Sequence, residues 1–265
     1  MPSANTGSLL VKSIKIYQDH VTLSFAHKKE KLKISKDAFL STYIYEGKLL
    51  SKKEIKKIKE IDAISLLLNY ALNLINKRHY SEKVLREKLY KKQANKEAIN
   101  QVILRLKEND LLDDQALMED LINWDNERNF GQNKIIKHLK EQGVPDSLIN
   151  KIKFKPSEEL KKAKRLIPKL EKKYARYGFN NMKKHIYQSL VAYGFSYETA
   201  SEALSFLKEA NQKEETAKLK IDYKKIKKKL ENKYEGYQLK QKIYSALLNK
   251  GYKSSEIRKV LEDEQ

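Results

Sequence analysis

The chain contains no cysteine, and it is poor in glycine and proline. Without a thiol there is no disulfide framework, no thiolate metal site and no thiol nucleophile, which suits a reducing compartment. With only 8 Gly and 4 Pro in 265 residues, material for a turn-rich β protein is scarce, and long helices are favoured. The length allows one large domain or two ordinary ones.

Long apolar runs are also missing. The longest apolar patches, such as residues 64–68, fall far short of the roughly 18 residues that suggest a membrane helix. Residues 1–15 lack a basic segment followed by an apolar stretch, so the sequence predicts no signal peptide. We therefore expect a cytoplasmic monomer with no membrane partner.

Catalytic constellations are absent as well. The sequence has no glycine-rich phosphate loop, no nucleophile elbow and no zincin motif, and its histidines are scattered. Asp113 and Asp114 form an adjacent acidic pair of the kind used for general acid and base catalysis, but a helix N-cap followed by a first-turn acid is favoured. We predict no catalytic residue, no metal site and no cofactor, and a nuclease is disfavoured.

The charge of the chain is strongly positive. The net charge is +21, and residues 151–265 supply +14 of it, from 29 basic and 15 acidic side chains. Such an excess attracts nucleic acid, an acidic protein surface or a nucleoprotein assembly; the alternative is that it only keeps the protein soluble. Only 7 of the 56 basic residues are Arg, which favours non-specific lysine–phosphate contacts over reading of base edges.

Two hydrophobic periodicities divide the chain. Between residues 9 and 34 apolar and polar residues alternate, which predicts a β meander too small to be stable without the helices. After about residue 50 the spacing is helical, and it starts at a capping-box pattern that begins with Ser51. Residues of the types that begin helices follow at Ser81, Asn95, Asp113, Ser157 and Ser254.

An internal repeat organises the helical part. Its anchors are Gln93, Gly143, Gly194 and Gly251, which stand 50, 51 and 57 residues apart, and leucine precedes each anchor by four residues. Glycine at such a position ends a helix in the left-handed conformation. The same conformation costs a glutamine roughly 1 kcal/mol, so the sequence leaves the turn at Gln93 open.

Each repeat is predicted to be a three-helix module that buries its apolar faces against its neighbours. Such modules stack into an extended body with a concave surface. The predicted fold is mainly α: tandem three-helix repeats forming an elongated curved solenoid, with a small N-terminal β meander. The predicted boundaries are residues 1–50 for the meander and linker, and 51–110, 111–155, 156–210 and 211–265 for the four repeats.

Two lysine-rich runs, at residues 161–165 and 224–229, lie in the first helices of the third and fourth repeats. Stacked repeats would align them into one basic stripe; the alternative for each is an ordinary solvated helix face. Trp124, the sole tryptophan, falls in phase with Leu117 and Leu121, which favours core packing over base stacking. Four tyrosines of the last two repeats are suited either to stack on unpaired bases or to fill joints: Tyr177, Tyr193, Tyr237 and Tyr252.

A longer motif occupies residues 71–153. It contains Arg78, Ser81-Glu82-x-x-Leu85-x-x-Lys88-Leu89, Leu111-Leu112-Asp113-Asp114, Arg128, Gly131 and Ile135-x-x-x-Leu139-x-x-x-Gly143-Val144. In these residues the chain resembles the RecX family. The sequence departs from the family pattern at Gln93, where glycine is usual, and at Leu117-Met118, where an aromatic–alanine pair is usual.

The resemblance implies a regulator of the RecA recombinase, in recombination and DNA repair, that has no catalysis of its own. Members of this family bind the RecA filament on single-stranded DNA and inhibit strand exchange and ATP hydrolysis or promote disassembly. The alternative is a stand-alone helical protein that binds DNA without sequence specificity. The candidate contacts with the filament or DNA are basic residues: Arg78, Lys83, Arg86, Arg128, Lys134, Lys161, Lys162, Lys164, Arg165, Lys224, Lys225, Lys227 and Lys228.

Overall fold

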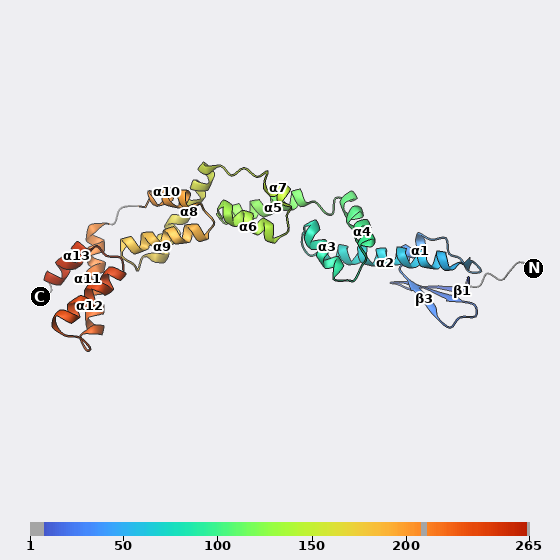
Figure 1. Ribbon diagram of the computed structural model, residues 1–265, viewed down its shortest axis with the longest axis horizontal. Helices are drawn as coiled ribbons and strands as arrows, with labels where there is room; N and C mark the ends of the chain where they lie inside the picture. Colours follow the sequence, from blue (N-terminus) through green and yellow to red (C-terminus); the bar gives the residue numbers. More distant parts are fainter. Residues whose placement is uncertain (1–7, 208–210, 264–265) are drawn as a thin grey trace, which may run out of the picture. The chain divides into compact units, whose positions relative to one another are not determined.

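The computed structural model describes residues 8–207 and 211–263. These residues form thirteen helices and a small antiparallel sheet, which confirms the predicted mainly helical fold with an N-terminal β region (Figure 1). The chain divides into two compact units: Met1–Met118 with Gln142–Pro145 (unit 1), and Glu119–Glu141 with Asp146–Gln265 (unit 2). The four repeat boundaries stay a prediction, and the one at residue 210 lies outside the described residues.

The sheet belongs to unit 1. Its strands are β1 (Leu9–Ile16), β2 (Val21–Phe25), β3 (Lys31–Ile34) and β4 (Leu49–Leu50), in the order β3-β2-β1-β4. The first three are the strands expected from alternation, whereas β4 has two residues and no period of its own. Val11, Leu23 and Ile34 are buried in one core with Ile58 of the following helix, so the sheet packs on a helix as predicted.

The helices fall into groups with separate cores. Unit 1 contains α1 (Lys36–Leu40), α2 (Lys52–Ile75), α3 (Glu82–Tyr90), α4 (Lys96–Glu108) and the start of α5 (Asp114–Glu127). Unit 2 contains the rest of α5, α6 (Gln132–Glu141), α7 (Asp146–Ile149), α8 (Pro156–Tyr174), α9 (Phe179–Ala192), α10 (Tyr197–Leu204), α11 (Gln212–Leu230), α12 (Gly236–Asn249) and α13 (Ser254–Asp263). Helices α2–α4, α8–α10 and α11–α13 each enclose a hydrophobic core.

Local capping explains where several helices begin. The side chains of Ser51, Ser81 and Asn95 each accept a hydrogen bond from the backbone three residues on, as predicted, and Ser51 forms a full capping box. The prediction of a start at Ser157 is wrong. Helix α8 already begins at Pro156, because proline has no amide hydrogen to satisfy and its fixed φ suits the first helical position.

The repeat anchors adopt left-handed turns. The φ angles of Gly143, Gly194 and Gly251 are 76°, 94° and 95°, which confirms the predicted helix ends. Gln93 has a φ of 57°. The turn that the sequence left open is therefore left-handed as well, despite the cost of that conformation for a residue with a Cβ.

One kind of hydrogen bond recurs three times at the starts of α3, α6 and α9. The first amide of each helix donates to a carboxylate of a later helix: Glu82 N to Asp114 Oδ1 (2.8 Å), Gln132 N to Glu159 Oε2 (2.8 Å) and Phe179 N to Glu215 Oε1 (2.7 Å). We call Asp114, Glu159 and Glu215 the joint carboxylates. A helix cannot satisfy its own first amides, so each bond fixes the start of one helix to a later helix segment of the same unit.

The residue that precedes each of these helices rests on a left-handed glycine turn. Ser81 Oγ donates to the carbonyl of Gln142 (2.7 Å), Gly131 N to that of Tyr193 (2.8 Å) and Gly178 N to that of Lys250 (2.9 Å). A Cβ on Gly131 would overlap the carbonyl carbon of Gly194, and a Cβ on Gly178 would lie 2.8 Å from that of Gly251. Glycine is therefore required at both positions by close backbone approach.

We expect Gly131→Ala to lower the free energy of unfolding by about 3 kcal/mol, because the added methyl group meets backbone rather than a movable side chain. Gly236→Ala is the matched control. Gly236 has a φ of 52°, and a methyl group on its Cα would have nothing within 4 Å, so this change should cost only about 1 kcal/mol. Thermal unfolding followed by circular dichroism checks both, and equal losses would contradict the steric explanation.

Candidate nucleic-acid and partner interface

The predicted contact residues of unit 1 lie around the start of α3. Arg78 and Lys83 are exposed, and the Arg78 guanidinium lies 4.4 Å from the centroid of the Tyr80 ring. Arg86 is half-buried: its Nε donates to Glu82 Oε1 (2.7 Å) and its Nη1 to Asn100 Oδ1 (2.7 Å). Arg86 is thus held within unit 1, whereas Arg78 and Lys83 stay available at its surface.

Two carboxylates near the same helix start have opposite pKa shifts. Burial alone raises the pKa of Glu82, but hydrogen bonds from Lys107 and Arg86 outweigh it and leave that pKa below its usual value. Burial also raises the pKa of Asp114. The hydrogen bond from the Glu82 amide lowers it by less than burial raises it, and the negative charge of Glu82 adds to the rise, so the net shift is upward. Unit 1 therefore contains one carboxylate that its surroundings favour as an anion and one that they do not.

The acidic pair in this region is structural. Asp113 Oδ1 accepts from the amides of Gln115 (2.7 Å) and Ala116 (3.2 Å), which confirms the predicted N-cap. The interpretation of Asp114 as an acid facing only its own helix is incomplete, because its Oδ1 caps α3. Sequence neighbours could not show this, since the two helix starts are 32 residues apart.

The basic residues of α8 divide into surface and core. Lys161 and Arg165 are exposed. Lys162 is only 8% exposed: its Nζ pairs with the joint carboxylate Glu159 and donates to the carbonyl of Phe130 (2.8 Å). Lys164 is half-buried with its Nζ 3.2 Å from the Phe206 ring centroid. We therefore expect Lys162 to stabilise unit 2 rather than to contact a partner.

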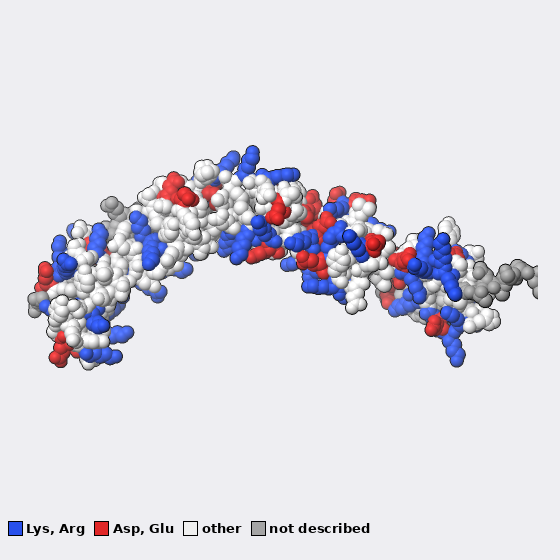
Figure 2. Space-filling model, viewed as in Figure 1, with Lys and Arg blue, Asp and Glu red and all other residues white. Residues whose placement is uncertain are grey.

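The basic residues of α11 are mainly exposed. Lys224, Lys225 and Lys228 lie at the surface, while Lys227 is half-buried, 5.7 Å from the centroid of the Tyr223 ring. On the face shown in Figure 2, Lys and Arg side chains lie over both units, interspersed with acidic ones. These lysines form a cationic end of α11 that suits contact with phosphates.

The expected single basic stripe does not follow from the repeat. The joint carboxylates mark equivalent positions, and Lys161 comes two residues after Glu159, whereas Lys224 comes nine residues after Glu215. The first run therefore lies around the middle of α8 and the second near the end of α11. The sequence showed that α8 and α11 are equivalent helices of two repeats. Which residues of the two helices correspond became clear only from the positions of the joint carboxylates.

The four tyrosines have different environments. Tyr252 is 2% exposed, and its hydroxyl donates to Asp222 Oδ2 (2.8 Å); burial, together with this bond, raises its pKa. Tyr177 and Tyr193 are half-buried, and Tyr237 is 75% exposed. Tyr252 therefore fills an interior position, while base stacking by Tyr237 stays a prediction.

The core prediction for Trp124 is wrong, because its side chain is 46% exposed. Leu117 is buried, but so are Met118 and Asp125, which are seven residues apart, so at this turn the buried face of α5 contains Asp125 and not Trp124. The Arg128 guanidinium lies 3.0 Å from the Trp124 ring centroid, and Lys134 Nζ lies 3.7 Å from the Phe130 ring centroid. Two predicted contact residues, Arg128 and Lys134, thus lie beside exposed or half-buried aromatic rings, which the helical period alone did not indicate.

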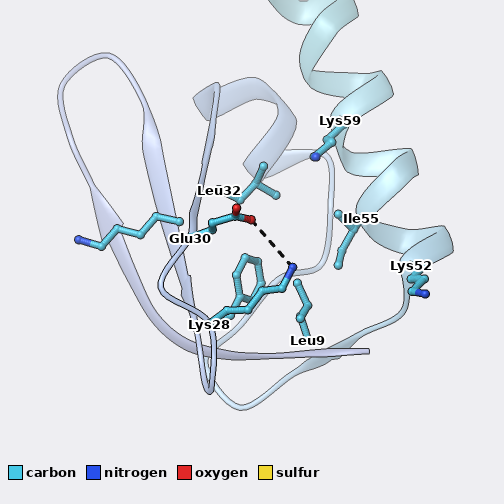
Figure 3. Close-up of a pocket in the computed structure, with 9 residues that line it drawn as sticks. Leu9, Lys28, Glu30, Leu32, Lys52, Ile55 and Lys59 are labelled. Carbon is cyan, nitrogen blue, oxygen red and sulfur yellow. Dashed lines mark ion pairs between the residues drawn. The ribbon is translucent and has the colours of Figure 1, made fainter. Parts of the chain in front are cut away.

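A hollow of about 380 Å³ lies between the sheet and α2 in unit 1 (Figure 3). Its apolar lining includes Leu9, Phe25 and Ile55, and its rim carries lysines together with Glu30, whose carboxylate is 4.0 Å from Lys28 Nζ. No local sequence pattern indicated this feature, because strand pairing brings its lining together. Its amines and single carboxylate suit binding rather than a reaction.

No group of three or more potential metal-ligating side chains occurs in residues 8–207 and 211–263. Within these ranges, no helix combines the length and apolar character needed to cross a bilayer. The described surface has ammonium and guanidinium groups next to aromatic rings. The cations suit anions, and the rings suit other ring systems.

Comparisons with known proteins give consistent matches. Residues 68–106 match the first three-helix domain of RecX, and residues 214–261 match the third. A regulatory protein RecX from Streptococcus thermophilus is 30% identical over 241 residues, which are 89% of this chain and 92% of that protein. One from Streptococcus pneumoniae is 30% identical over 239 residues, 88% and 92% of the two chains.

Solved structures agree in fold. A crystal structure of a regulatory protein RecX matches with a TM-score of 0.60 at 19% identity, over 74% of this chain and 99% of that one. The crystal structure of RecX from Lactobacillus salivarius matches with a TM-score of 0.50 at 26% identity, over 54% and 96%. The helical architecture described above is therefore shared with these proteins.

We expect Asp114→Asn to raise the unfolding midpoint at neutral pH, because the amide keeps an acceptor for the Glu82 amide and removes a buried charge. A carboxyl whose folded pKa is raised opposes folding above that pKa. The gain should therefore shrink as the pH falls toward about 3.9, the ordinary pKa of aspartate, where the native side chain is also neutral. Thermal unfolding across this pH range checks the prediction, and a gain that grows on acidification would contradict it.

Neighbouring lysines on α8 provide a matched pair. Lys162→Ala should lower the free energy of unfolding by about 3–5 kcal/mol, because it leaves Glu159 buried without its cation. Lys161→Ala removes an exposed lysine whose partner is the exposed Glu158, and should change stability by less than about 1 kcal/mol. Chemical unfolding of both variants checks this, and similar stabilities would show that the Glu159–Lys162 pair is not structural.

Proposed function

The chain belongs to the RecX family, and we propose that it binds the RecA filament on single-stranded DNA and inhibits the recombinase without catalysis of its own. The proposal includes a cytoplasmic location, since that is where such a filament forms. The observation that carries it is the cluster of exposed lysines on α11, Lys224, Lys225 and Lys228, in the half of the chain with most of the excess charge. A nucleoprotein filament is a polyanion that such a surface attracts.

The contacts favour backbone recognition. Lysine is a mobile point charge, so the exposed lysines suit phosphates and acidic side chains and do not suit discrimination between bases. A protein that regulates by binding has only to attach to the filament. The cations and aromatic rings on the described surface are suited to such attachment. The second candidate, a stand-alone non-specific DNA-binding protein, is supported by the same lysines.

The experiment that separates the two measures the single-strand-dependent ATPase and strand exchange of RecA with substoichiometric amounts of this protein. We expect both activities to fall. No effect at any ratio would reject the regulator, and inhibition that appears only when the protein covers all free DNA would indicate the stand-alone binder.

Charge reversal tests the surface itself. Lys224→Glu with Lys225→Glu should weaken binding to the filament and to single-stranded DNA, whereas Lys12→Glu with Lys15→Glu, an equal charge change on exposed lysines of β1, should have little effect. Each lost phosphate contact should reduce the log–log salt slope of single-strand binding by about 0.7. Fluorescence anisotropy over a salt series measures both, and equal effects of the two pairs would contradict a localised surface.

A further inference from the structure

A hollow of about 440 Å³ lies in unit 2 beside α5, α6 and the end of α9. Its lining includes Trp124, Phe130, Lys134 and His138. This volume falls within the range of roughly 300–1,000 Å³ that is usual for ligand pockets. The hollow is separate from the lysine-rich end of α11 on which the proposed function depends.

Trp124 and His138 line the hollow, and Arg128, which does not line it, packs against the Trp124 ring. The Trp124 indole is 46% exposed, although it is the largest aromatic side chain of the protein. The Arg128 guanidinium lies 3.0 Å from its ring centroid, and the His138 ring is tilted by 43° at a centroid distance of 5.6 Å. A planar guanidinium and an indole both offer faces on which a base can stack.

The lining of the hollow also contains a lysine next to aromatic rings. Lys134 Nζ lies 3.7 Å from the Phe130 ring centroid and 5.6 Å from that of Tyr193. Lys137, also on the rim, pairs with Glu141 at 3.8 Å. Lys134 is thus placed to meet a phosphate, while its stem lies against the rings.

The imidazole of His138 is held in place by a buried carboxylate. His138 Nδ1 lies 2.9 Å from Asp125 Oδ2, and Asp125 is fully buried. This bond fixes the orientation of the imidazole ring next to Trp124. Asp125 Oδ1, also buried, has no hydrogen-bond partner among the described residues. Burial of a carboxylate is costly, and the contact with His138 partly offsets that cost.

We propose that this hollow binds one unpaired nucleobase of single-stranded nucleic acid, stacked on the Trp124 indole that Arg128 supports, with the adjoining phosphate at Lys134. The inference rests on the single-strand part of the proposed function and adds a base-stacking site to it. An apolar protein side chain is the less suitable occupant, because it would cover Lys134 without offering an anion. A nucleotide supplies both a ring face and a negative charge.

Trp124 is the only tryptophan, so its fluorescence reports this site in the unmodified protein. The probe is a short oligothymidylate, compared with an abasic oligodeoxynucleotide of the same length and charge at the same salt. We expect saturable quenching of Trp124 emission by the first and little by the second. Equal quenching by both, or none by either, would overturn the proposal.

Affinity measurements on variants give a second test. Trp124→Ala should weaken oligothymidylate binding about five-fold or more, with Trp124→Phe in between, and should leave the abasic affinity unchanged. Tyr197→Ala is the matched control, because Tyr197 is 67% exposed on α10 and does not line the hollow. Circular dichroism confirms that each variant is folded.

The remaining outcomes are separable. If Trp124→Ala binds oligothymidylate as the native chain does but no longer inhibits RecA, a side chain of the protein partner occupies the hollow and the proposal is overturned. If the native chain has no effect on RecA but shows base-dependent quenching, the proposed regulation fails and the stacking site stands.

Discussion

The structure depends on a hydrogen bond between the first amide of a helix and a carboxylate that comes from a later helix. This bond occurs at Asp114, Glu159 and Glu215, and each time the residue before the helix contacts the carbonyl that precedes a left-handed glycine. The bond is favourable because an amide that its own helix leaves unsatisfied finds a carboxylate oxygen as acceptor. At two of these sites the backbones come so close that Gly131 and Gly178 have no room for a Cβ.

The same constraint sorts the lysines. At the joint carboxylate Glu159, Lys162 neutralises the negative charge and is buried, whereas the adjacent Lys161 stays exposed. Lysines far from a joint, such as Lys224 and Lys225, stay in solvent. The many lysines of this chain therefore serve two purposes: some stabilise the fold and others attract polyanions. Even adjacent lysines, such as Lys161 and Lys162, differ in this respect.

Part of the candidate interface could be predicted from the sequence and part could not. The exposed basic residues Arg78, Lys161 and Lys224 follow from charge alone, because an unpaired lysine or arginine is rarely buried. Trp124 was misassigned because it shares a helical face with the buried Leu117, whereas at its own turn the buried side chain is that of the adjacent Asp125. The contacts of Trp124 with Arg128 and His138, and the hollow that Trp124 and His138 line, were not predicted from the sequence.

The sequence by itself determined the helical class, the small β region, the caps at Ser51, Ser81 and Asn95, and the left-handed turns at the three anchor glycines. These features depend on residues a few positions apart, whose hydrogen bonds and side-chain period are set locally. The tertiary structure alone decided which carboxylate caps which helix, which lysine is buried, and that the single tryptophan faces solvent. Those outcomes depend on contacts between segments tens of residues apart, and a local pattern carries no information about which distant group will be its neighbour.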